Sequence, residues 1–412
     1  MIIRKAMYGC GLNFFIKLAY NSLFLYKFAN KTSYMTAYQS PFQFGTLATD
    51  ENFIDRVEDR ALLKQLLSSH INVMLISPRR WGKSSLVKKA TTELTNENQD
   101  IRICYIDAFS IGSEAEFYRT FASKVIACAS SKFERWITDA RKFLSGVVPQ
   151  IVVNDQVTDF VAFDLKFVPQ EEDKMTILNL TEMLAKEKNI KIIVCIDEFQ
   201  QLANLPEYKE MEGKMRSVWQ QQRLSTYCLY GSKRNMMLNI FNNSNSPFYR
   251  FGQVIFMDKI SKEHWIPFIQ SSFEKTGKAI SHHYAEQICD IVACHSWYLQ
   301  QLCYFVWSFT ESEVTEETFA VGVKQVLNIN TPMFQNDTEN LSATQIEMLR
   351  AIANNEQHFS SQDAKRNYNL GNPNTIVKNK KTLQNKDIIE LQKGNFDFVD
   401  PIYRLWFKGE YC

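Results

Sequence analysis

The first pattern along the chain is an alternation of short apolar runs with helix-like stretches, which begins near residue 42. The apolar runs are rich in Ile, Val and Cys, which is typical of strands that are buried on both faces of a sheet. We therefore expect strands at 72–76, 101–107, 191–197, 226–230 and 254–257. Helical stretches lie between them, including 84–94, 114–130 and 175–188. This order indicates an α/β fold built on a parallel sheet.

Other segments depart from this alternation. Residues 149–167 alternate apolar and polar positions around Asn154 and Asp155, which predicts a β-hairpin inserted into the α/β core. After Ser261 the pattern is helical, at 284–294, 297–310 and 316–328, and we interpret the polar stretch 328–340, with Pro332, as a linker.

The last 70 or so residues form a separate unit. Helical stretches at 344–354, 361–368 and 375–386 precede two short strands at 388–392 and 396–399. Three helices followed by a β-ribbon describe a winged helix-turn-helix. We therefore expect a core at 35–260, a helical lid at 261–330 and a winged helix at 341–412, preceded by a leader at 1–34.

A phosphate-binding sequence follows the first expected strand. The run from Ser77 to Ser84 fits the pattern GxxxxGK[ST] at every position except the first, where Ser77 replaces glycine. A tight loop at a helix N-terminus directs several backbone N–H groups at one phosphate. Gly82 would allow close approach, Lys83 would bridge phosphates, and Ser84 would offer its hydroxyl to Mg²⁺. The residues expected to surround the phosphates are Ser77, Pro78, Arg79, Arg80, Trp81, Gly82, Lys83, Ser84 and Ser85.

The serine at the first position of this loop has a conformational consequence. If that position requires a positive φ, Ser77 costs roughly 1 kcal/mol of strain, which would weaken nucleotide affinity.

A second motif supports the first. The apolar strand 191–197 ends in Asp197, and Glu198 follows it. Asp197 at the strand end would reach the same Mg²⁺ as Ser84, and Glu198 would deprotonate the attacking water.

Together these motifs resemble those of the archaeal-type ATPases in the STAND/AAA+ branch of P-loop NTPases, and particularly the AAA-family ATP-binding proteins of Bacteroidetes. The resemblance runs from about Pro41 to the C-terminus. It implies a P-loop NTPase sheet with a helical lid, a C-terminal winged helix-turn-helix and Mg²⁺-dependent ATPase activity. It also implies that the segment 53–58, with Phe53 and Arg56, lies near the adenine.

The resemblance suggests further site residues. Ser232, in Tyr230-Gly231-Ser232, would be the polar sensor between Glu198 and the γ-phosphate. Arg250, in Pro247-Phe248-Tyr249-Arg250, would be an arginine finger or sensor, although an ordinary surface arginine is an alternative. His295 matches a lid motif near the nucleotide, but it could equally be a helix-end histidine. Arg216 is a weaker finger candidate. The closing segment 399–406 is similar to the family's aromatic tail, which packs on the wing or lid.

Charge limits the nucleic-acid interpretation. The chain has 47 Lys+Arg and 45 Asp+Glu among its 412 residues, so the net charge of +2 excludes a protein coated in basic charge. DNA binding would need a local patch, for which we nominate Lys378, Lys380 and Lys381 beside asparagines such as Asn379. A winged helix that docks protein or inhibits the ATPase is the alternative.

Nine cysteines spread along the chain indicate reduced thiols and a cytoplasmic protein rather than a disulfide framework. Cys289, Cys294 and Cys303 lie near His283 and His295, but no CxxC pair supports zinc, and buried helix thiols are the favoured interpretation.

The first 34 residues carry five basic and no acidic residues, and their longest uncharged run is too short to span a bilayer. We favour Met35 as the true start, with a basic amphipathic surface helix as the alternative.

The leading functional hypothesis is an ATP-hydrolysing switch that couples ATP or ADP to the winged helix, with a protein partner or self-association open. The alternative is a DNA-binding transcriptional or mobile-element regulator in which ATP is mainly structural.

Overall fold

The computed structural model describes residues 40–46, 53–54, 56–130, 133–144, 150–154, 162–166, 169–392 and 394–412. The chain divides into two compact units, Met1–Pro41 and Phe42–Cys412, and every helix and strand within the described ranges belongs to the second. The leader and the proposed start at Met35 lie outside the described residues.

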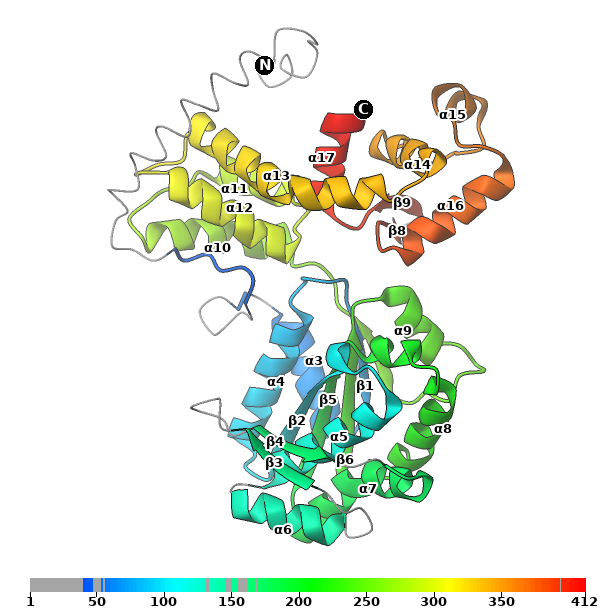
Figure 1. The fold of residues 1–412 in the computed structure, drawn as a ribbon. Helices are drawn as coiled ribbons and strands as arrows, with labels where there is room; N and C mark the ends of the chain where they lie inside the picture. The colour runs from blue at the N-terminus through cyan, green and yellow to red at the C-terminus, as the bar shows by residue number, and fades with distance from the viewer. Residues whose placement is uncertain are drawn as a thin grey trace. The chain divides into compact units, whose positions relative to one another are not determined.

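Five parallel strands form the central sheet, in the order β2-β5-β6-β1-β7 (Figure 1). They are β1 (Val73–Ile76), β2 (Ile101–Asp107), β5 (Lys191–Asp197), β6 (Ser225–Gly231) and β7 (Gln253–Phe256). Every residue of β1 and β6 is buried, as apolar runs without polar alternation predict for central parallel strands. The five expected strands are thus confirmed, and because they are parallel their carboxyl ends share one edge of the sheet.

Helices cover both faces of this sheet (Figure 1). On one face, α3 (Val57–Ser68) and α4 (Lys83–Glu97) pack on alternate strand residues such as Val73 and Leu75. On the other face, Met74 and Ile76 pack with α5, α7, α8 and α9. These helices span Glu114–Ala129, Glu171–Lys188, Tyr208–Trp219 and Arg234–Phe241, and α6 spans Phe133–Phe143. The two-residue period of the strands therefore divides the core into two apolar layers.

The inserted hairpin is confirmed. Strands β3 (Gln150–Asn154) and β4 (Ala162–Lys166) are antiparallel, and Asn154 pairs with Ala162. The segment 155–161 between the two strands, with Asp155, lies outside the described residues.

A second apolar cluster joins the lid to the winged helix. The lid contains α10 (Lys262–Glu274), α11 (His282–Ile291), α12 (Ser296–Phe309) and α13 (Glu316–Glu339). The winged helix contains α14 (Ala343–Ala353), α15 (Gln362–Asn367), α16 (Pro373–Asn385), β8 (Ile389–Gln392) and β9 (Asn395–Phe398). The three expected helices and the β-ribbon are therefore present.

The linker expected at 328–340 is wrong, because α13 continues through it to Glu339. Pro332 removes one backbone donor from the helix, but packing compensates. Phe334 is buried and stacks on Tyr403 with ring centroids 5.0 Å apart. The Asn330 side chain donates to the carbonyl of Val326 at 2.7 Å and to Gln301 Oε1 at 3.2 Å.

The closing segment is also more regular than expected, because it forms α17 (Pro401–Tyr411). Asp400 caps this helix, and Pro401 occupies its first turn, where a proline costs no hydrogen bond. Tyr403 contacts Phe334 of the lid and Phe398 of the wing, which confirms the expected packing. None of the helices within the described ranges is long and apolar enough to cross a membrane.

Candidate functional site

The phosphate-binding sequence forms a loop, residues 77–82, that joins β1 to α4 at the carboxyl edge of the sheet. Gly82 has φ +92° and its carbonyl accepts from the N–H of Leu86 at 2.9 Å, which starts α4. The expected strain at Ser77 is not found: the positive φ of a non-glycine loop residue belongs to Arg80, at +66°. Ser77 is fully buried, and its N–H donates to the carbonyl of Gly231 at 3.3 Å. The loop therefore bends at Arg80 and Gly82, and a serine fits its first position.

Four polar side chains meet where β1 and β5 end. The Ser84 hydroxyl donates to Asp197 Oδ2 at 2.6 Å. Lys83 Nζ donates to Glu198 Oε1 at 2.6 Å and lies 3.8 Å from Asp197 Oδ1. The backbone N–H of Glu198 donates to Asp197 Oδ1 at 2.8 Å and so orients the Asp197 carboxylate, while Lys83 lies near both carboxylates. The structure thus brings together the four residues on which the sequence analysis relied most.

Two further side chains hold the Glu198 carboxylate. Ser232 Oγ, just after β6, donates to Glu198 Oε2 at 2.7 Å, and Gln200 Nε2 donates to the same oxygen at 2.5 Å. Glu198 itself has φ +49° and so leaves the strand direction at this point. Gln200 had no assigned role in the sequence analysis, and its place two residues after Glu198 was the available signal. A Cβ at Gly231 would lie 1.8 Å from Gln200 Oε1, so glycine makes room for this amide.

The two carboxyl groups have different acidities. Burial raises the pKa of Asp197, and this effect outweighs the opposing influence of Lys83 and Ser84. Burial also acts to raise the pKa of Glu198, but the charge of Lys83 and the hydrogen bonds from Lys83, Ser232 and Gln200 bring it below its ordinary value. Glu198 is therefore ionised at neutral pH and can accept a proton.

An aromatic cavity of about 370 Å³ adjoins the loop. Its walls combine loop residues 80–85 with apolar side chains that include Phe44, Phe53, Trp81, Trp265 and Trp297. The Arg80 guanidinium lies 4.7 Å from the ring centroid of Trp297. Such a cavity next to a phosphate loop suits a flat aromatic base.

Arg56 fixes one wall of this cavity. Its Nη1 donates to the carbonyl of Asp258 at 2.5 Å and to Asp59 Oδ2 at 2.9 Å, and its Nη2 donates to the carbonyl of Trp81 at 3.4 Å. Arg56 is therefore tied to the phosphate loop and to the chain that leaves β7, whereas Phe53 contributes an apolar wall.

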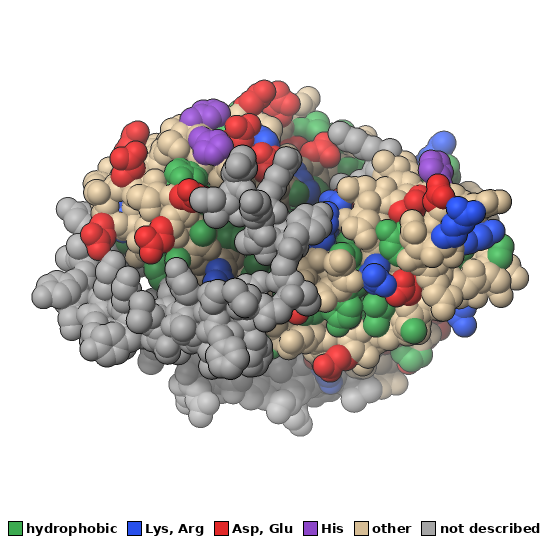
Figure 2. All heavy atoms as spheres, turned by 90° about the horizontal axis from the view of Figure 1, so that it is seen from above, with side chains coloured by type: hydrophobic (Ala, Val, Ile, Leu, Met, Phe, Trp, Pro, Cys, Tyr) green, Lys and Arg blue, Asp and Glu red, His purple; other side chains and the backbone are tan. Residues whose placement is uncertain are grey.

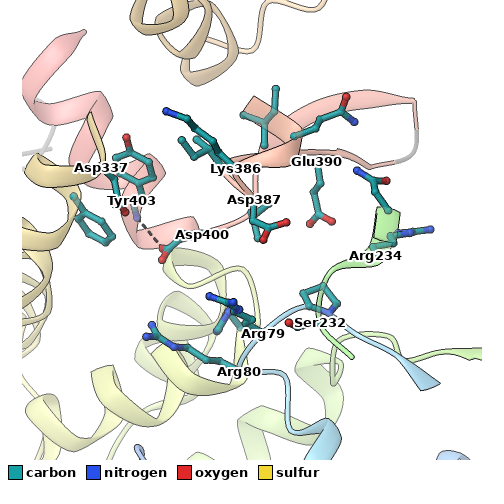
Figure 3. Close-up of a pocket in the computed structure, with 18 of the residues that line it drawn as sticks. Arg79, Arg80, Ser232, Arg234, Asp337, Lys386, Asp387, Glu390, Asp400 and Tyr403 are labelled. Carbon is teal, nitrogen blue, oxygen red and sulfur yellow. Dashed lines mark hydrogen bonds between the residues drawn. The ribbon is translucent and has the colours of Figure 1, made fainter. Parts of the chain in front are cut away.

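A second cavity, of about 650 Å³, adjoins the loop at Arg79 and Arg80 (Figure 3). Arg79, Arg80 and Ser232 line it from the ATPase core, and Asp387 and Glu390 line it from the winged helix (Figure 3). Burial raises the pKa of Asp387, while the charges of Lys233 and Arg79 oppose this rise. Acidic groups of the wing thus face basic groups of the phosphate loop.

His295 lines the second cavity at the start of α12. It is 5% exposed, and its Nδ1 has no hydrogen-bond partner among the residues that the structure describes. Burial, with the charges of Lys259 and Arg80, lowers its pKa to about 3. His295 is therefore neutral at physiological pH.

The structure does not bring Arg250 to this site. Strands β1 and β7 are parallel, and the N–H of Gln253 donates to the carbonyl of Asn72, before β1. Arg250 therefore lies at the amino edge of the sheet, opposite the phosphate loop, where it is exposed over the ring of Tyr249. Arg216 packs over Phe251 in the same region. Neither arginine reaches the phosphate loop of its own chain.

The candidate DNA-contacting residues on α16 divide into two groups. Lys378 and Lys381 are exposed. The Lys380 ammonium instead lies 4.5 and 4.8 Å from the ring centroids of Phe359 and Phe396, and burial lowers its pKa. Asn379 is 5% exposed and donates to Thr344 Oγ1, so it turns inward. Figure 2 shows blue side chains on the winged-helix side of the molecule, interspersed with red ones.

Comparisons with known proteins agree with this architecture. The model of a family described as an ATPase domain predominantly from Archaea matches residues 53–302, and that of a probable winged helix domain matches residues 332–409. No curated protein matches the chain.

Two solved structures share the fold. The Walker-type ATPase PABY2304 of Pyrococcus abyssi is 17% identical with a TM-score of 0.65, over 89% of this chain and 99% of that one. The ORC2 protein of Aeropyrum pernix, solved as ADPNP–ADP complexes, is 15% identical with a TM-score of 0.51, over 87% and 95%.

Proposed function

We propose that this chain, which belongs to the family of ATPase domains found predominantly in Archaea, binds ATP and hydrolyses it with Mg²⁺. The observation that carries the proposal is the convergence of Lys83, Ser84, Asp197 and Glu198 beside an aromatic cavity. Backbone N–H groups of the loop 77–85 would surround the phosphates, because a helix N-terminus favours negative charge. Phe53 and Trp297 would enclose the adenine.

The oxygen ligands suit Mg²⁺. A serine hydroxyl and a carboxylate, 2.6 Å apart in Ser84 and Asp197, are hard donors of the kind this ion prefers, with phosphate oxygens completing its coordination. When bound, the ion supplies positive charge that offsets negative charge on the phosphates.

Lys83 would bind Glu198 when no nucleotide is present and the phosphates when ATP is bound. Its ammonium now hydrogen-bonds Glu198, so a phosphate must compete with that carboxylate for it. Glu198, freed from Lys83 but still held by Ser232 and Gln200, would accept the proton of the attacking water.

The remaining predicted residues take narrower roles in this proposal. Ser232 positions Glu198, and neutral His295 forms part of the wall of the cavity beside Arg79 and Arg80. Arg250 can act as an arginine finger only towards the site of a second copy, because it lies at the opposite edge of its own sheet.

ATP binding would be coupled to the winged helix across the second cavity. Arg79 and Arg80 belong to the phosphate loop, and the wing presents Asp387 and Glu390 to the same space. A change in the loop would therefore alter the electrostatic contacts of the wing, which makes the chain a nucleotide-dependent switch.

The second candidate function is a DNA-binding regulator in which ATP is mainly structural. The exposed Lys378 and Lys381 on the third helix of a winged-helix domain favour it.

Two substitutions test the leading proposal. Lys83→Ala should abolish binding of a fluorescent ATP analogue, because the analogue loses its phosphate ligand. Glu198→Gln should retain binding and lower kcat by at least about 100-fold, because the general base is lost. Release of inorganic phosphate measures kcat.

The exposed Lys209→Ala and Glu172→Gln serve as matched controls and should behave as wild type. If Glu198→Gln hydrolysed ATP at the wild-type rate, the assignment of the base would be wrong. If the wild-type protein bound ATP without turnover and also bound DNA, the regulator would be favoured.

A further inference from the structure

Two cysteines are brought together where α11 ends. The N–H of Cys294 donates to the carbonyl of Cys289 at 2.9 Å, and that of Ala293 donates to Asp290 at 3.1 Å. Ala293 and Cys294 have φ values of +46° and +55°. These are the two hydrogen bonds of a Schellman motif, which places the first and sixth side chains of the turn in contact. That contact is usually apolar, but here both side chains carry a thiol.

The two thiols hydrogen-bond each other but differ in their surroundings. Cys289 is fully buried, whereas Cys294 is half-buried and therefore reachable by a small molecule. The hydrogen bond from Cys289 and the charges of Lys259 and Lys262 lower the pKa of Cys294 to about 7, against the opposing effect of burial. The same hydrogen bond, together with burial, raises the pKa of Cys289. The outer sulfur is thus the more acidic one, as an attacking thiol should be.

We propose that Cys294 and Cys289 form a peroxide-reactive dithiol, in which Cys294 is the attacking sulfur and Cys289 resolves it to a disulfide. The Cys294 thiolate attacks one oxygen of a hydroperoxide, so that an S–O bond forms, the O–O bond breaks and hydroxide (or alkoxide) leaves and takes up a proton. The Cys289 sulfur then attacks the Cys294 sulfenic acid, so that the S–S bond forms and the S–O bond breaks. The proton of Cys289 leaves with the hydroxyl as water. The two sulfurs lose two electrons together, and the peroxide gains them.

Other thiol pairs in the described part of the chain lack this combination. Cys195 and Cys228 are register partners on β5 and β6, but both are fully buried. Cys104 is buried beside Cys128, which is half-buried, and Cys128 Sγ donates to the carbonyl of Val125 at 3.1 Å. The Cys128 thiol is thus engaged with the backbone of its own helix, α5. Cys128 is half-buried like Cys294 and therefore serves as the matched control for Cys294.

The dithiol lies next to residues that line both cavities. Cys294 immediately precedes His295, which lines the second cavity, and Ser296 and Trp297, which line the aromatic one. A disulfide would therefore fix the turn from which these side chains project. This consequence rests on the proposed nucleotide site, but the chemistry of the dithiol does not.

The test uses the full-length reduced protein, hydrogen peroxide at neutral pH and peptide mass spectrometry, with no nucleotide present. We expect loss of two hydrogen atoms from the peptides that contain Cys289 and Cys294, reversed by dithiothreitol. Cys294→Ser should abolish this product, and Cys128→Ser should leave it unchanged. In Cys289→Ser, dimedone should label Cys294, because its sulfenic acid can no longer be resolved.

A measurement on the wild-type protein guards against variants that fail to fold. Alkylation of native Cys294 by iodoacetamide should rise with pH and reach half its maximal rate near pH 7. Disulfides that involve Cys128 instead, or a Cys294 that stays reduced while Cys128 is oxidised, would overturn the proposal. Because no nucleotide enters these measurements, either result is independent of ATP binding.

Discussion

At the scale of single residues, the site is an arrangement in which each polar group depends on its neighbours. Lys83 hydrogen-bonds Glu198, and Glu198 stays ionised because Lys83, Ser232 and Gln200 together outweigh its burial. The distinction between Asp197 and Glu198 follows from this: the former is the more basic carboxylate, and the latter is held ready as a proton acceptor. Two adjacent acids in the sequence thus acquire different chemistry from their surroundings alone.

His295 should make the folding stability depend on pH. Its pKa falls from 6.5 to about 3 in the folded protein. The unfolded chain therefore binds the proton more readily, so the contribution of His295 to stability is complete above about pH 6.5 and is lost as the pH falls towards 3. At about pH 5 we expect a loss of about 2 kcal/mol from this residue.

Urea unfolding at two pH values measures this effect. The difference between about pH 7.5 and pH 5 should shrink in His295→Gln and persist in the control His283→Gln, which alters an exposed histidine. An equal pH dependence in wild type and His295→Gln would show that the buried imidazole is not responsible.

At the scale of helices and strands, caps and packing decide where elements begin and end. Asp400 accepts from the N–H groups of Ile402 and Tyr403, each at 2.9 Å, and from the Tyr298 hydroxyl. It therefore starts α17 and also ties this helix to α12 of the lid.

Removal of this cap should destabilise the protein. Asp400→Ala should lower the free energy of unfolding by about 1–2 kcal/mol, because two N–H groups lose their acceptor. Asp400→Asn should cost less, since asparagine caps nearly as well. Urea unfolding at neutral pH compares the two variants; equal losses would mean that the charge, rather than the cap, matters.

The strands and the phosphate-binding motifs could be predicted because their signals are local. The run Lys191–Asp197 is apolar and followed by an acid, and it forms β5 with those bounds. The continuation of α13 could not be predicted, because the packing of Phe334 on Tyr403 joins residues 69 positions apart in the chain. The packing of Lys380 on Phe359 and Phe396 could not be predicted either, because these rings belong to segments distant from Lys380 in the sequence. The place of Arg250 required the direction of β7 relative to β1.

At the scale of the whole molecule, the surface of the winged helix offers a test of DNA binding. The double variant Lys378→Gln/Lys381→Gln should weaken binding of duplex DNA and reduce the slope of log affinity against log salt by about two. Each exposed lysine would otherwise release about one counterion from a phosphate. Fluorescence anisotropy at several salt concentrations measures the slope.

Lys380→Gln is the matched control for this experiment, because its ammonium lies against two aromatic rings rather than in solvent. It should leave the slope nearly unchanged. A loss in Lys380→Gln as large as in the double variant would contradict the assigned surface.

Self-association is tested by complementation between two inactive proteins. Arg250→Ala keeps a complete phosphate site, and Lys83→Ala keeps an intact Arg250. If Arg250 acts on a second copy, mixing the two variants should restore hydrolysis that neither shows alone, and the wild-type rate per molecule should rise with concentration. Full activity of Arg250→Ala by itself would remove Arg250 from the reaction.

The unbroken α13 has a mechanical consequence. Its 24 residues extend about 36 Å, and its two ends belong to different parts of the molecule: one packs with α12 of the lid, the other with α17. A rod of that length acts as a lever, so a tilt of about 10° at the lid end moves the far end by about 6 Å. A small rotation of the lid end of α13 would therefore move its other end, beside α17, by about the rise of one turn of an α-helix.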